Sequence, residues 1–239
     1  MRRETGAVQN RLLNSLSPAD RDLLLPQGEA FHLDRGDVLF DPGENVVNVY
    51  FPGEGTIASF LMQLDDGVTT EAAMIGCEGA VGGIVSFGRK PAFAQAIVQI
   101  SGSALRISTD VVEAAKQRSD SLRDHFARYA DCLLAQVVQS VACNAAHDYE
   151  ARLARWLLAT RDRIGGHELR VTHQFVSEML GVQRSYTSRV LSALEKEGAI
   201  ETGRGCIRIT DSAALQRRAC ECYGKLREHF DRLLPGVLA

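Results

Sequence analysis

The spacing of apolar and polar positions changes twice along the chain and divides it into three parts. Over residues 31–108, short apolar stretches alternate with glycine-containing turns at residues 34–37, 41–44, 51–55 and 76–79. Turn signals at intervals of roughly 8–12 residues predict antiparallel strands that close into a β-roll. In front of this region, residues 10–16 predict a short helix, and Ser17-Pro18 predicts a second one, with Ser17 as its N-cap.

A long helix is predicted after the β-roll. Asp110 is the expected cap of a short helix over residues 111–118, and a long helix follows over residues 119–147. A broad apolar face on a long connecting helix predicts contact with a partner, and packing against the chain's own domain is the alternative. We expect a homodimer interface made by Leu122, Phe126, Leu133, Val137 and Val141, with Ala130 in the same stripe and Tyr129, Leu134 and Val138 on its flank.

The last third of the chain contains two short helical patterns joined by a glycine. Residues 172–180 have the period of a helix capped by Thr172, and Gly181 permits a sharp turn because glycine adopts positive φ. Residues 184–196 predict a second helix whose buried positions are Thr187, Val190, Leu191 and Leu194. Two such helices form a helix-turn-helix, in which the second helix enters the major groove of DNA.

The free face of the second helix has side chains suited to reading bases. Arg184 and Arg189 can donate two hydrogen bonds each to guanine O6 and N7, and Ser185 and Ser188 can reach bases or phosphates. Residues 201–209 then predict a β-hairpin wing, with Arg204 near its tip. A three-helix domain that merely has surface arginines is the alternative. The order of turn, amphipathic helix and basic wing favours DNA binding.

Composition narrows the class of protein further. The chain has 239 residues, of which 45% are hydrophobic and 24% charged, as in an ordinary globular protein of one or two domains. No apolar run approaches the roughly 18 residues that span a bilayer, and the polar N-terminus does not resemble a signal peptide, so we expect a cytoplasmic protein and no membrane partner. Residues 148–239 contain 15 Lys+Arg against 12 Asp+Glu, whereas residues 1–147 contain 12 against 18. A basic second part agrees with phosphate binding there.

Two segments resemble the Crp/Fnr family of bacterial regulators. One runs from residue 172 to 200 and continues in Arg204-Gly-Cys-Ile-Arg-Ile-Thr-Asp211. The other, Arg35-Gly-Asp-Val-Leu-Phe-Asp-Pro-Gly-Glu44, is similar to the opening of that family's cyclic-nucleotide-binding-like β-roll. The resemblance covers about residues 10–235. It implies an α+β fold with a sensor β-roll and flanking helices over 1–118, a dimerisation helix over 119–147 and a winged helix-turn-helix over 148–239.

The resemblance also implies a function. It predicts a sequence-specific transcription regulator that binds an inverted-repeat operator in double-stranded DNA as a homodimer, with RNA polymerase and a small-molecule effector as further candidate partners. Arg184, Ser185 and Arg189 match the family's base-reading positions. Thr172, His173 and Gln174 match its phosphate-contacting positions.

The predicted sensor domain departs from the nucleotide-binding pattern. Cyclic-nucleotide-binding members hold the phosphate with a Gly-Glu pair and an Arg-Ser or Arg-Thr pair, but here the comparable positions are residues 79–84 and Ala92-Phe93. A phosphate without a guanidinium loses its strongest charge-assisted contact, so we expect no tight binding of cAMP. Gly82, Gly83 and Arg89 are candidates for a weaker ligand site, and the identity of any effector stays open.

The six cysteines suggest reduced thiols and no metal site. No cysteine precedes Cys77, so the N-terminal iron–sulfur cluster of some family members is not available. Cys143 and His147 lie one helical turn apart, but two ligands do not make a site, and Cys220 and Cys222 are expected to point apart on one helix over residues 213–234. A thiol-redox-responsive regulator, an effector-independent regulator and a protein-interaction module are the alternatives.

An enzyme is not expected. The β-rich region contains a single histidine, His32, where a metal-binding barrel would need clustered histidines and carboxylates. The chain also lacks the Gly-x-Ser-x-Gly pattern of a hydrolase nucleophile.

Overall fold

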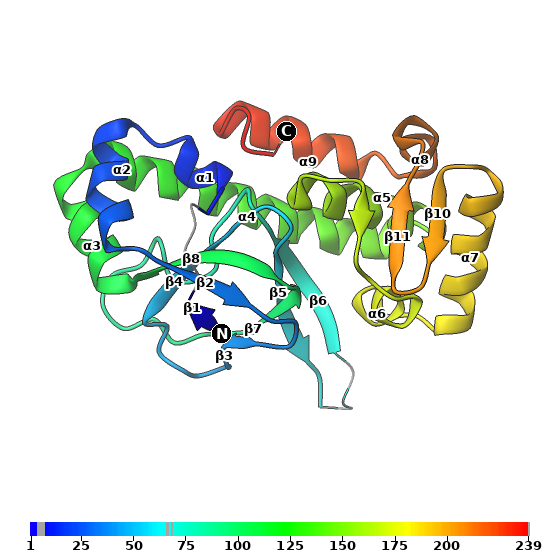
Figure 1. Cartoon of the computed structure of the whole chain (residues 1–239), viewed down its shortest axis with the longest axis horizontal. Helices are drawn as coiled ribbons and strands as arrows, with labels where there is room; N and C mark the ends of the chain where they lie inside the picture. The colour runs from blue at the N-terminus through cyan, green and yellow to red at the C-terminus, as the bar shows by residue number, and fades with distance from the viewer. Residues whose placement is uncertain (4–7, 66, 68, 239) are drawn as a thin grey trace.

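The structure is a computed structural model that describes residues 1–3, 8–65, 67 and 69–238. A β-rich region lies at one end of the molecule, a long helix runs past it, and helices with a small three-stranded sheet lie at the other end (Figure 1). The predicted α+β fold with its antiparallel roll, long helix and C-terminal helix-turn-helix is confirmed. Among the described residues, no helix combines the length and the apolarity needed to cross a bilayer.

Two four-stranded antiparallel sheets form the β-roll. The first has the strand order β1-β2-β8-β4, with β1 at Arg2–Arg3, β2 at Glu29–Leu33, β8 at Gly102–Ser108 and β4 at Asn48–Pro52. The second has the order β3-β7-β5-β6, with β3 at Val38–Phe40, β7 at Gln95–Ile100, β5 at Ile57–Gln63 and β6 at Thr69–Ile75. The strands β2 to β8 therefore lie in or next to the range of residues 31–108 in which alternating apolar stretches and turns predicted them, whereas β1 was not predicted.

Short helices precede the roll. They are α1 (Arg11–Asn14), α2 (Pro18–Leu24) and the 3-10 helix η1 (Leu25–Gln27). The Ser17 hydroxyl caps α2, with Pro18 at its first position, as the sequence predicted. The Asn10 side chain caps α1 and is fully buried. Its amide group donates hydrogen bonds to the carbonyls of Pro52 and Gly79 at 2.9 and 2.8 Å. This one side chain thus fastens the N-terminal segment to the roll.

The two helices after the roll begin and end close to the predicted positions. The first, α3, spans Thr109–Arg118, and its cap is Ser108 rather than the predicted Asp110. The long helix α4 spans Asp120–Ala146, with Ser119 as N-cap and His147 as C-cap. The predicted range of 119–147 differs from these bounds by one residue at each end.

The predicted dimer face of α4 needs a correction. Leu122 and Phe126 are fully buried inside this chain, where α1 and the roll cover them, so they present no surface to a second subunit. Leu133 and Val137 are half-buried. The exposed apolar side chains lie on the predicted flank and at its end, with Leu134, Val138 and Val141 exposed by 61, 61 and 66%. Apolar periodicity located the helix but did not distinguish the inward face from the outward one.

The C-terminal region begins with a helix that the sequence interpretation did not predict. This helix, α5, spans Tyr149–Ile164 and is capped by Asp148. It is followed by the short strand β9 (Glu168–Leu169), by α6 (His173–Met179) and α7 (Arg184–Lys196), and by the hairpin strands β10 (Ile200–Gly203) and β11 (Cys206–Ile209). The strand β9 pairs with β11, so the predicted two-stranded wing is part of a three-stranded sheet of order β10-β11-β9.

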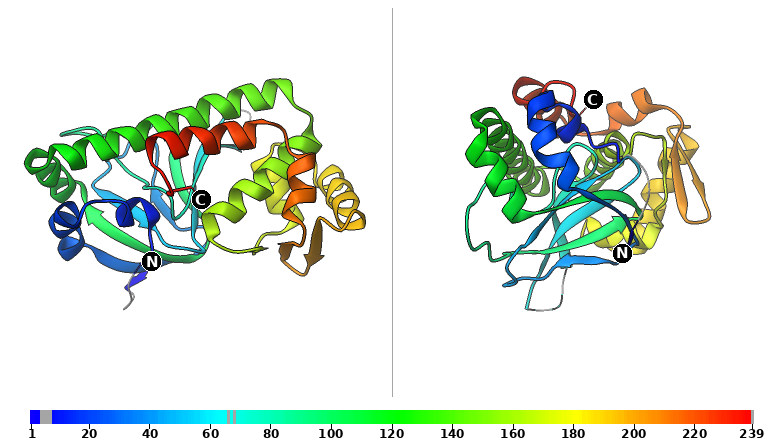
Figure 2. Two further views of the ribbon diagram at one scale, coloured as in Figure 1. Left: turned by 90° about the horizontal axis from the view of Figure 1, so that it is seen from above. Right: turned by 60° about the vertical axis from the view of Figure 1, so that its left-hand side comes forward.

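The prediction of one helix over residues 213–234 is wrong. The chain forms α8 (Ser212–Arg218) and a separate helix α9 (Cys222–Leu233), with Ala219, Cys220 and Glu221 between them. Two different cores explain the break. Leu215 packs in the C-terminal core, whereas Leu226 and Phe230 pack in the core of the roll, and a straight helix could not reach both. Because of the break, α9 lies alongside α4 (Figure 2, left).

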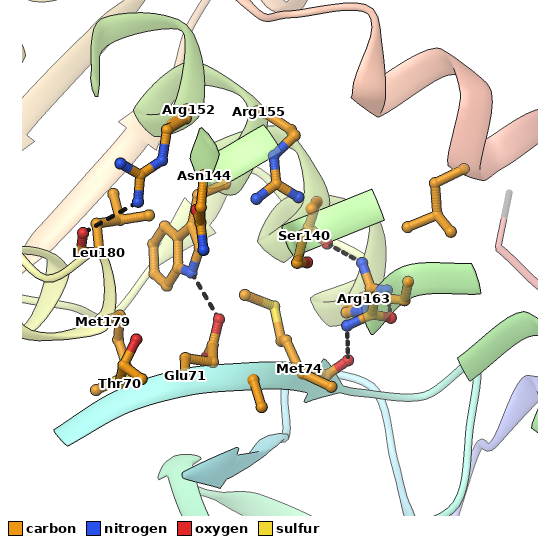
Figure 3. A pocket seen from close by; sticks show the side chains of 16 residues that line it. Thr70, Glu71, Met74, Ser140, Asn144, Arg152, Arg155, Arg163, Met179 and Leu180 are labelled. Atoms are coloured by element: carbon orange, nitrogen blue, oxygen red, sulfur yellow. Dashed lines mark hydrogen bonds between the residues drawn. The ribbon is translucent and has the colours of Figure 1, made fainter. Parts of the chain in front are cut away.

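The two ends of the molecule share one hydrophobic core. Ile57, Leu61 and Met74 of the roll pack in the same buried cluster as Trp156 and Phe175 of the C-terminal region. Figure 3 shows the arginines of α5 facing strand β6, which carries Glu71 and Met74. The cavity between them is small, about 40 Å³. The C-terminal region is therefore packed directly against the roll.

A buried ion pair joins the same two ends. Arg163 of α5 donates from Nε to Glu78 Oε1 at 2.8 Å, and both side chains are 2% exposed. Arg163 also donates to Gln136 Oε1 of α4 at 2.8 Å, and the Gln136 amide donates to the Met74 carbonyl at 2.9 Å. The remaining Glu78 oxygen accepts from the Gly76 N–H at 3.0 Å. The network contacts the roll, the long helix and the C-terminal region at once.

Candidate DNA interface

The helices α6 and α7 are joined by the tight turn that the sequence predicted. Thr172 caps α6, because its hydroxyl accepts from the Phe175 N–H at 3.1 Å. Gly181 has a φ of +67°, in the left-handed region where other residues are strained, and this lets the chain reverse within a few residues. The inward faces of both helices are buried in the shared core, as predicted for Thr187, Val190, Leu191 and Leu194.

The outward face of α7 carries the predicted base-reading residues. Arg184, Ser185 and Arg189 are exposed, and Ser188 is half-buried. Residues 184, 185, 188 and 189 fall on one side of a helix because of their three- and four-residue spacing. The structure therefore brings these four side chains together on a surface that the rest of the chain leaves open.

Aromatic packing orients one of the two arginines. The Arg189 guanidinium lies over the Tyr186 ring, 4.8 Å from its centroid. Tyr186 in turn packs against Tyr149 with ring centroids 5.0 Å apart, and the Tyr149 hydroxyl lies 2.7 Å from the Thr187 hydroxyl. A guanidinium held on a ring loses less conformational freedom when it binds a base than a free one does.

The three residues at the start of the first helix have different surroundings. Thr172 is exposed and serves as the cap, and the Gln174 amide donates to Glu178 Oε1 at 2.7 Å. His173 Nδ1 lies 3.0 Å from Ser188 Oγ, which links the predicted phosphate-contacting end of α6 to the predicted base-reading face of α7. Burial lowers the pKa of His173, and the positive charge of Arg184 lowers it further. A pKa below the ordinary value of 6.5 leaves His173 mostly neutral at pH 7 in the free protein.

The wing presents Arg204 at its tip. The residues Gly203 and Cys206 are paired at the end of the hairpin, and Gly205 has a φ of +76° in the turn. Arg204 is exposed there. Arg208, on the neighbouring strand, is engaged instead with Glu168 at 2.9 Å.

The candidate ligand residues of the sensor domain lie in different environments. Gly82 and Gly83 are half-buried, and Arg89 is exposed. The Lys90 side chain packs on Gly83, so that a Cβ at Gly83 would meet Lys90 Cδ at 2.3 Å. Lys90 Nζ forms a close ion pair with Glu113 and donates to the Gly88 carbonyl at 2.7 Å. The chain's own lysine thus occupies the space beside Gly83, and the role of the three residues in ligand binding stays a prediction.

Five of the six cysteines fall into two groups, and Cys206 lies apart from them on β11. Burial raises the pKa of both Cys77 and Cys132 to about 12, so neither has appreciable thiolate at neutral pH, and thiolate is the form that oxidises readily. A second group gathers at one place: Cys143, Cys220 and Cys222 form their own buried cluster, close to His147. The sequence interpretation missed this group because it placed Cys220 and Cys222 on one continuous helix.

Fold and surface together define a class of protein. A β-roll, a long helix and a winged helix-turn-helix with an open basic face, in this order, are the parts of a DNA-binding transcription regulator. A family model described as the Crp-like helix-turn-helix domain matches residues 151–218, which extend from α5 to α8. No protein matches in a search of curated proteins.

Several solved structures have the same fold. FixK2 from Bradyrhizobium japonicum is 18% identical, with a TM-score of 0.67 over 81% of this chain and 98% of its own. TTHB099, a CRP family transcriptional regulator from Thermus thermophilus, is 20% identical, with a TM-score of 0.64 over 79% of this chain and 96% of its own. The regulator CLP from Xanthomonas campestris is 16% identical, with a TM-score of 0.63 over 81% of this chain and 99% of its own. The predicted resemblance to Crp/Fnr regulators is confirmed in two respects: residues 151–218 match the Crp-like helix-turn-helix domain, and the chain has the fold of these regulators.

Proposed function

We propose that the protein acts in the cytoplasm as a homodimer that reads an inverted-repeat DNA operator with α7. The observation that carries this proposal is the open face of α7, on which Arg184, Ser185, Ser188 and Arg189 lie together. Arginine donates bidentately to guanine in the major groove, so we infer half-sites that contain guanine. Thr172, His173 and Gln174 are assigned to phosphates beside the groove, and Arg204 to the backbone beside the wing.

The proposed dimer uses the outward face of α4. Leu134, Val138 and Val141 follow one another at intervals of four and three residues, so they form one stripe along the helix. Large apolar side chains that lie exposed and contiguous mark an interaction surface. A second copy of the same helix offers the matching stripe, and an isologous pair of helices would place two α7 helices for two half-sites.

A charge in the middle of this stripe is expected to separate the subunits. We expect Val138→Glu to convert the dimer to a monomer, because two carboxylates would meet across the two-fold axis in an apolar contact. Sedimentation velocity measures the change. Gln216→Glu, which adds the same charge to an exposed position of α8 outside the stripe, is expected to leave the dimer intact. A dimeric Val138→Glu variant would place the interface elsewhere.

DNA binding is expected to tighten as the pH falls. The pKa of His173 is lowered in the free protein, and a phosphate beside the ring would raise it, so the complex holds more protons than the free protein between the two pKa values. Affinity for the operator should then rise by up to about tenfold per pH unit for each subunit of the dimer as the pH falls through that window. Fluorescence anisotropy between pH 8 and 6 measures the slope.

The matched controls for this pH dependence are two histidine variants. His173→Gln is expected to flatten the slope, whereas His167→Gln, at an exposed position beside β9, should keep it. Equal slopes in both variants would remove His173 from the phosphate contact.

Selection from genomic DNA tests the proposed function directly. The purified protein is mixed with a library of genomic fragments at near-physiological salt, and the retained DNA is sequenced. Salt matters because phosphate contacts alone retain DNA without sequence preference at low ionic strength. Enrichment of an inverted repeat supports the proposal, and cAMP is not expected to change it, because the Lys90 side chain, paired with Glu113, occupies the space beside Gly83. Retention of DNA without any common sequence would contradict operator recognition.

A further inference from the structure

Four potential metal ligands meet where α4 ends. Cys143 and His147 come from the last turn and the C-cap of α4, Cys220 from the break before α9, and Cys222 from the first residue of α9. One ligand atom from each residue lies within 4.8 Å of the other three. Cys143 Sγ is 3.5 Å from Cys220 Sγ, and Cys222 Sγ is 3.5 Å from His147 Nδ1. The chain thus brings together residues 77 positions apart.

These separations are those of a tetrahedral mononuclear site. With Zn–S bonds of about 2.3 Å and Zn–N bonds of about 2.0–2.1 Å, tetrahedral angles put neighbouring sulfurs about 3.8 Å apart and sulfur and nitrogen about 3.6 Å apart. The observed contacts are close to both values. Iron–sulfur clusters distribute their cysteine ligands over several iron atoms, so their sulfurs lie farther apart than in this group.

The surroundings hold the four ligands in place. Cys143, Cys220 and Cys222 are exposed by 0, 8 and 2%, so the group is closed to solvent on the thiol side. His147 Nε2 lies 3.2 Å from Glu221 Oε2, which directs Nδ1 toward the cysteines. A carboxylate on the far nitrogen of a ligating histidine is a common support in zinc sites. The Gln139 amide donates to Cys222 Sγ at 2.9 Å, as outer partners of zinc-bound thiolates do.

We propose that Cys143, His147, Cys220 and Cys222 bind one zinc ion in a closed structural Cys₃His site. Four protein ligands and three thiolates suit zinc, and they leave no open position for a substrate. A disulfide between Cys143 and Cys220 would use only two of the four groups and would leave the convergence of His147 and Cys222 without a role. The inference goes beyond the proposed DNA binding, since none of the four ligands is among the residues assigned to DNA.

The proposed zinc site lies at the end of α4, where a metal would hold neighbouring helices together. His147 is the residue at which α4 ends, and Asp148 caps α5, the first helix of the C-terminal region. The metal would therefore fasten α9 to the joint between the long helix and the region that carries the helix-turn-helix. Binding of zinc to the folded chain alone stabilises it, so removal of zinc should lower the melting temperature and loosen this joint.

Metal analysis of the full-length protein tests the proposal. We expect protein purified under reducing conditions to contain one zinc ion per chain by inductively coupled plasma mass spectrometry. Replacement by Co²⁺ should give the thiolate-to-cobalt charge-transfer bands and the intense visible bands of a tetrahedral site. A metal-free protein that takes up neither ion, or one that forms the Cys143–Cys220 disulfide instead, would overturn the proposal. The assay needs no DNA, so its outcome is independent of operator binding.

Matched variants identify the ligands. Cys143→Ala and Cys222→Ala are expected to lose the metal, whereas Cys132→Ala, at another buried cysteine of α4, should keep it. Loss of a buried cysteine can also affect folding, so a second test uses His147, whose side chain is 24% exposed. His147→Cys should keep the metal and shift the cobalt spectrum toward that of a four-thiolate site, and His147→Ala should weaken metal binding. Unchanged metal content and spectrum in both His147 variants would overturn the assignment.

Discussion

Simultaneous replacement of Arg184 and Arg189 by alanine is expected to abolish specific operator binding while the protein stays folded and dimeric. Both side chains are exposed, so their loss removes no buried contact. In the free protein it removes the packing of Arg189 on Tyr186 and the charge of Arg184 that lowers the pKa of His173. Each bidentate arginine–guanine contact contributes about 1–3 kcal/mol of discrimination. The two arginines together therefore account for about 2–6 kcal/mol per half-site, which is about 30-fold to 10⁴-fold in affinity.

The control for this variant must lose the same charge. Arg217→Ala with Arg232→Ala removes two exposed arginines on α8 and α9, away from the face of α7. Competition binding with the selected operator and with unrelated DNA separates the two effects. We expect the control to weaken both kinds of DNA binding slightly, and the Arg184/Arg189 variant to lose the preference for the operator. Equal operator affinity for the two variants would mean that α7 does not read the sequence.

The second large effect is expected at the buried ion pair between Arg163 and Glu78. Either Arg163→Ala or Glu78→Ala should lower the free energy of unfolding by about 3–5 kcal/mol, because each leaves a buried charge without its partner. Urea denaturation followed by circular dichroism measures the loss. The double variant should cost less than the sum of the two single variants, because neither charge is then left alone.

An exposed ion pair supplies the comparison. Arg218 and Glu197 are also in close contact, but their side chains are exposed by 46 and 43%, so Arg218→Ala should cost no more than about 1 kcal/mol. A cost for Arg163→Ala as small as that for Arg218→Ala would contradict the burial of the Arg163–Glu78 pair in solution. Since Glu78 belongs to the roll and Arg163 to α5, we also expect the single variants to become more sensitive to proteolysis between the two ends.

Local patterns in the sequence predicted the parts of the fold that depend on local rules. The ends of α4, the cap at Thr172 and the turn at Gly181 follow from side-chain periodicity, capping and the positive φ of glycine. The same rules grouped Arg184 and Arg189 on one helix face. None of these features depends on residues far away in the chain, and this is why one sequence was enough to predict them.

Features that depend on distant contacts were missed or assigned wrongly. Leu122 and Phe126 have the spacing of a dimer interface, but periodicity cannot tell a partner's helix from the chain's own roll. The break after Arg218 exists because its two sides pack into different cores, and the convergence of Cys143 with Cys220 follows from that break. Likewise, nothing in the neighbourhood of Glu78 indicates that its partner lies on α5.

The core around Trp156 makes the roll and the C-terminal region depend on each other's side chains for packing. It takes Ile57, Leu61 and Met74 from the roll, so a fragment cut between residues 147 and 148 would expose an apolar face of α5 to water. For the same reason, a chimera that joins this helix-turn-helix to the roll of a distant relative would place unmatched surfaces against each other. The region proposed to read DNA is thus not an exchangeable module, because its helices α5 and α6 pack on strands β5 and β6 of the roll.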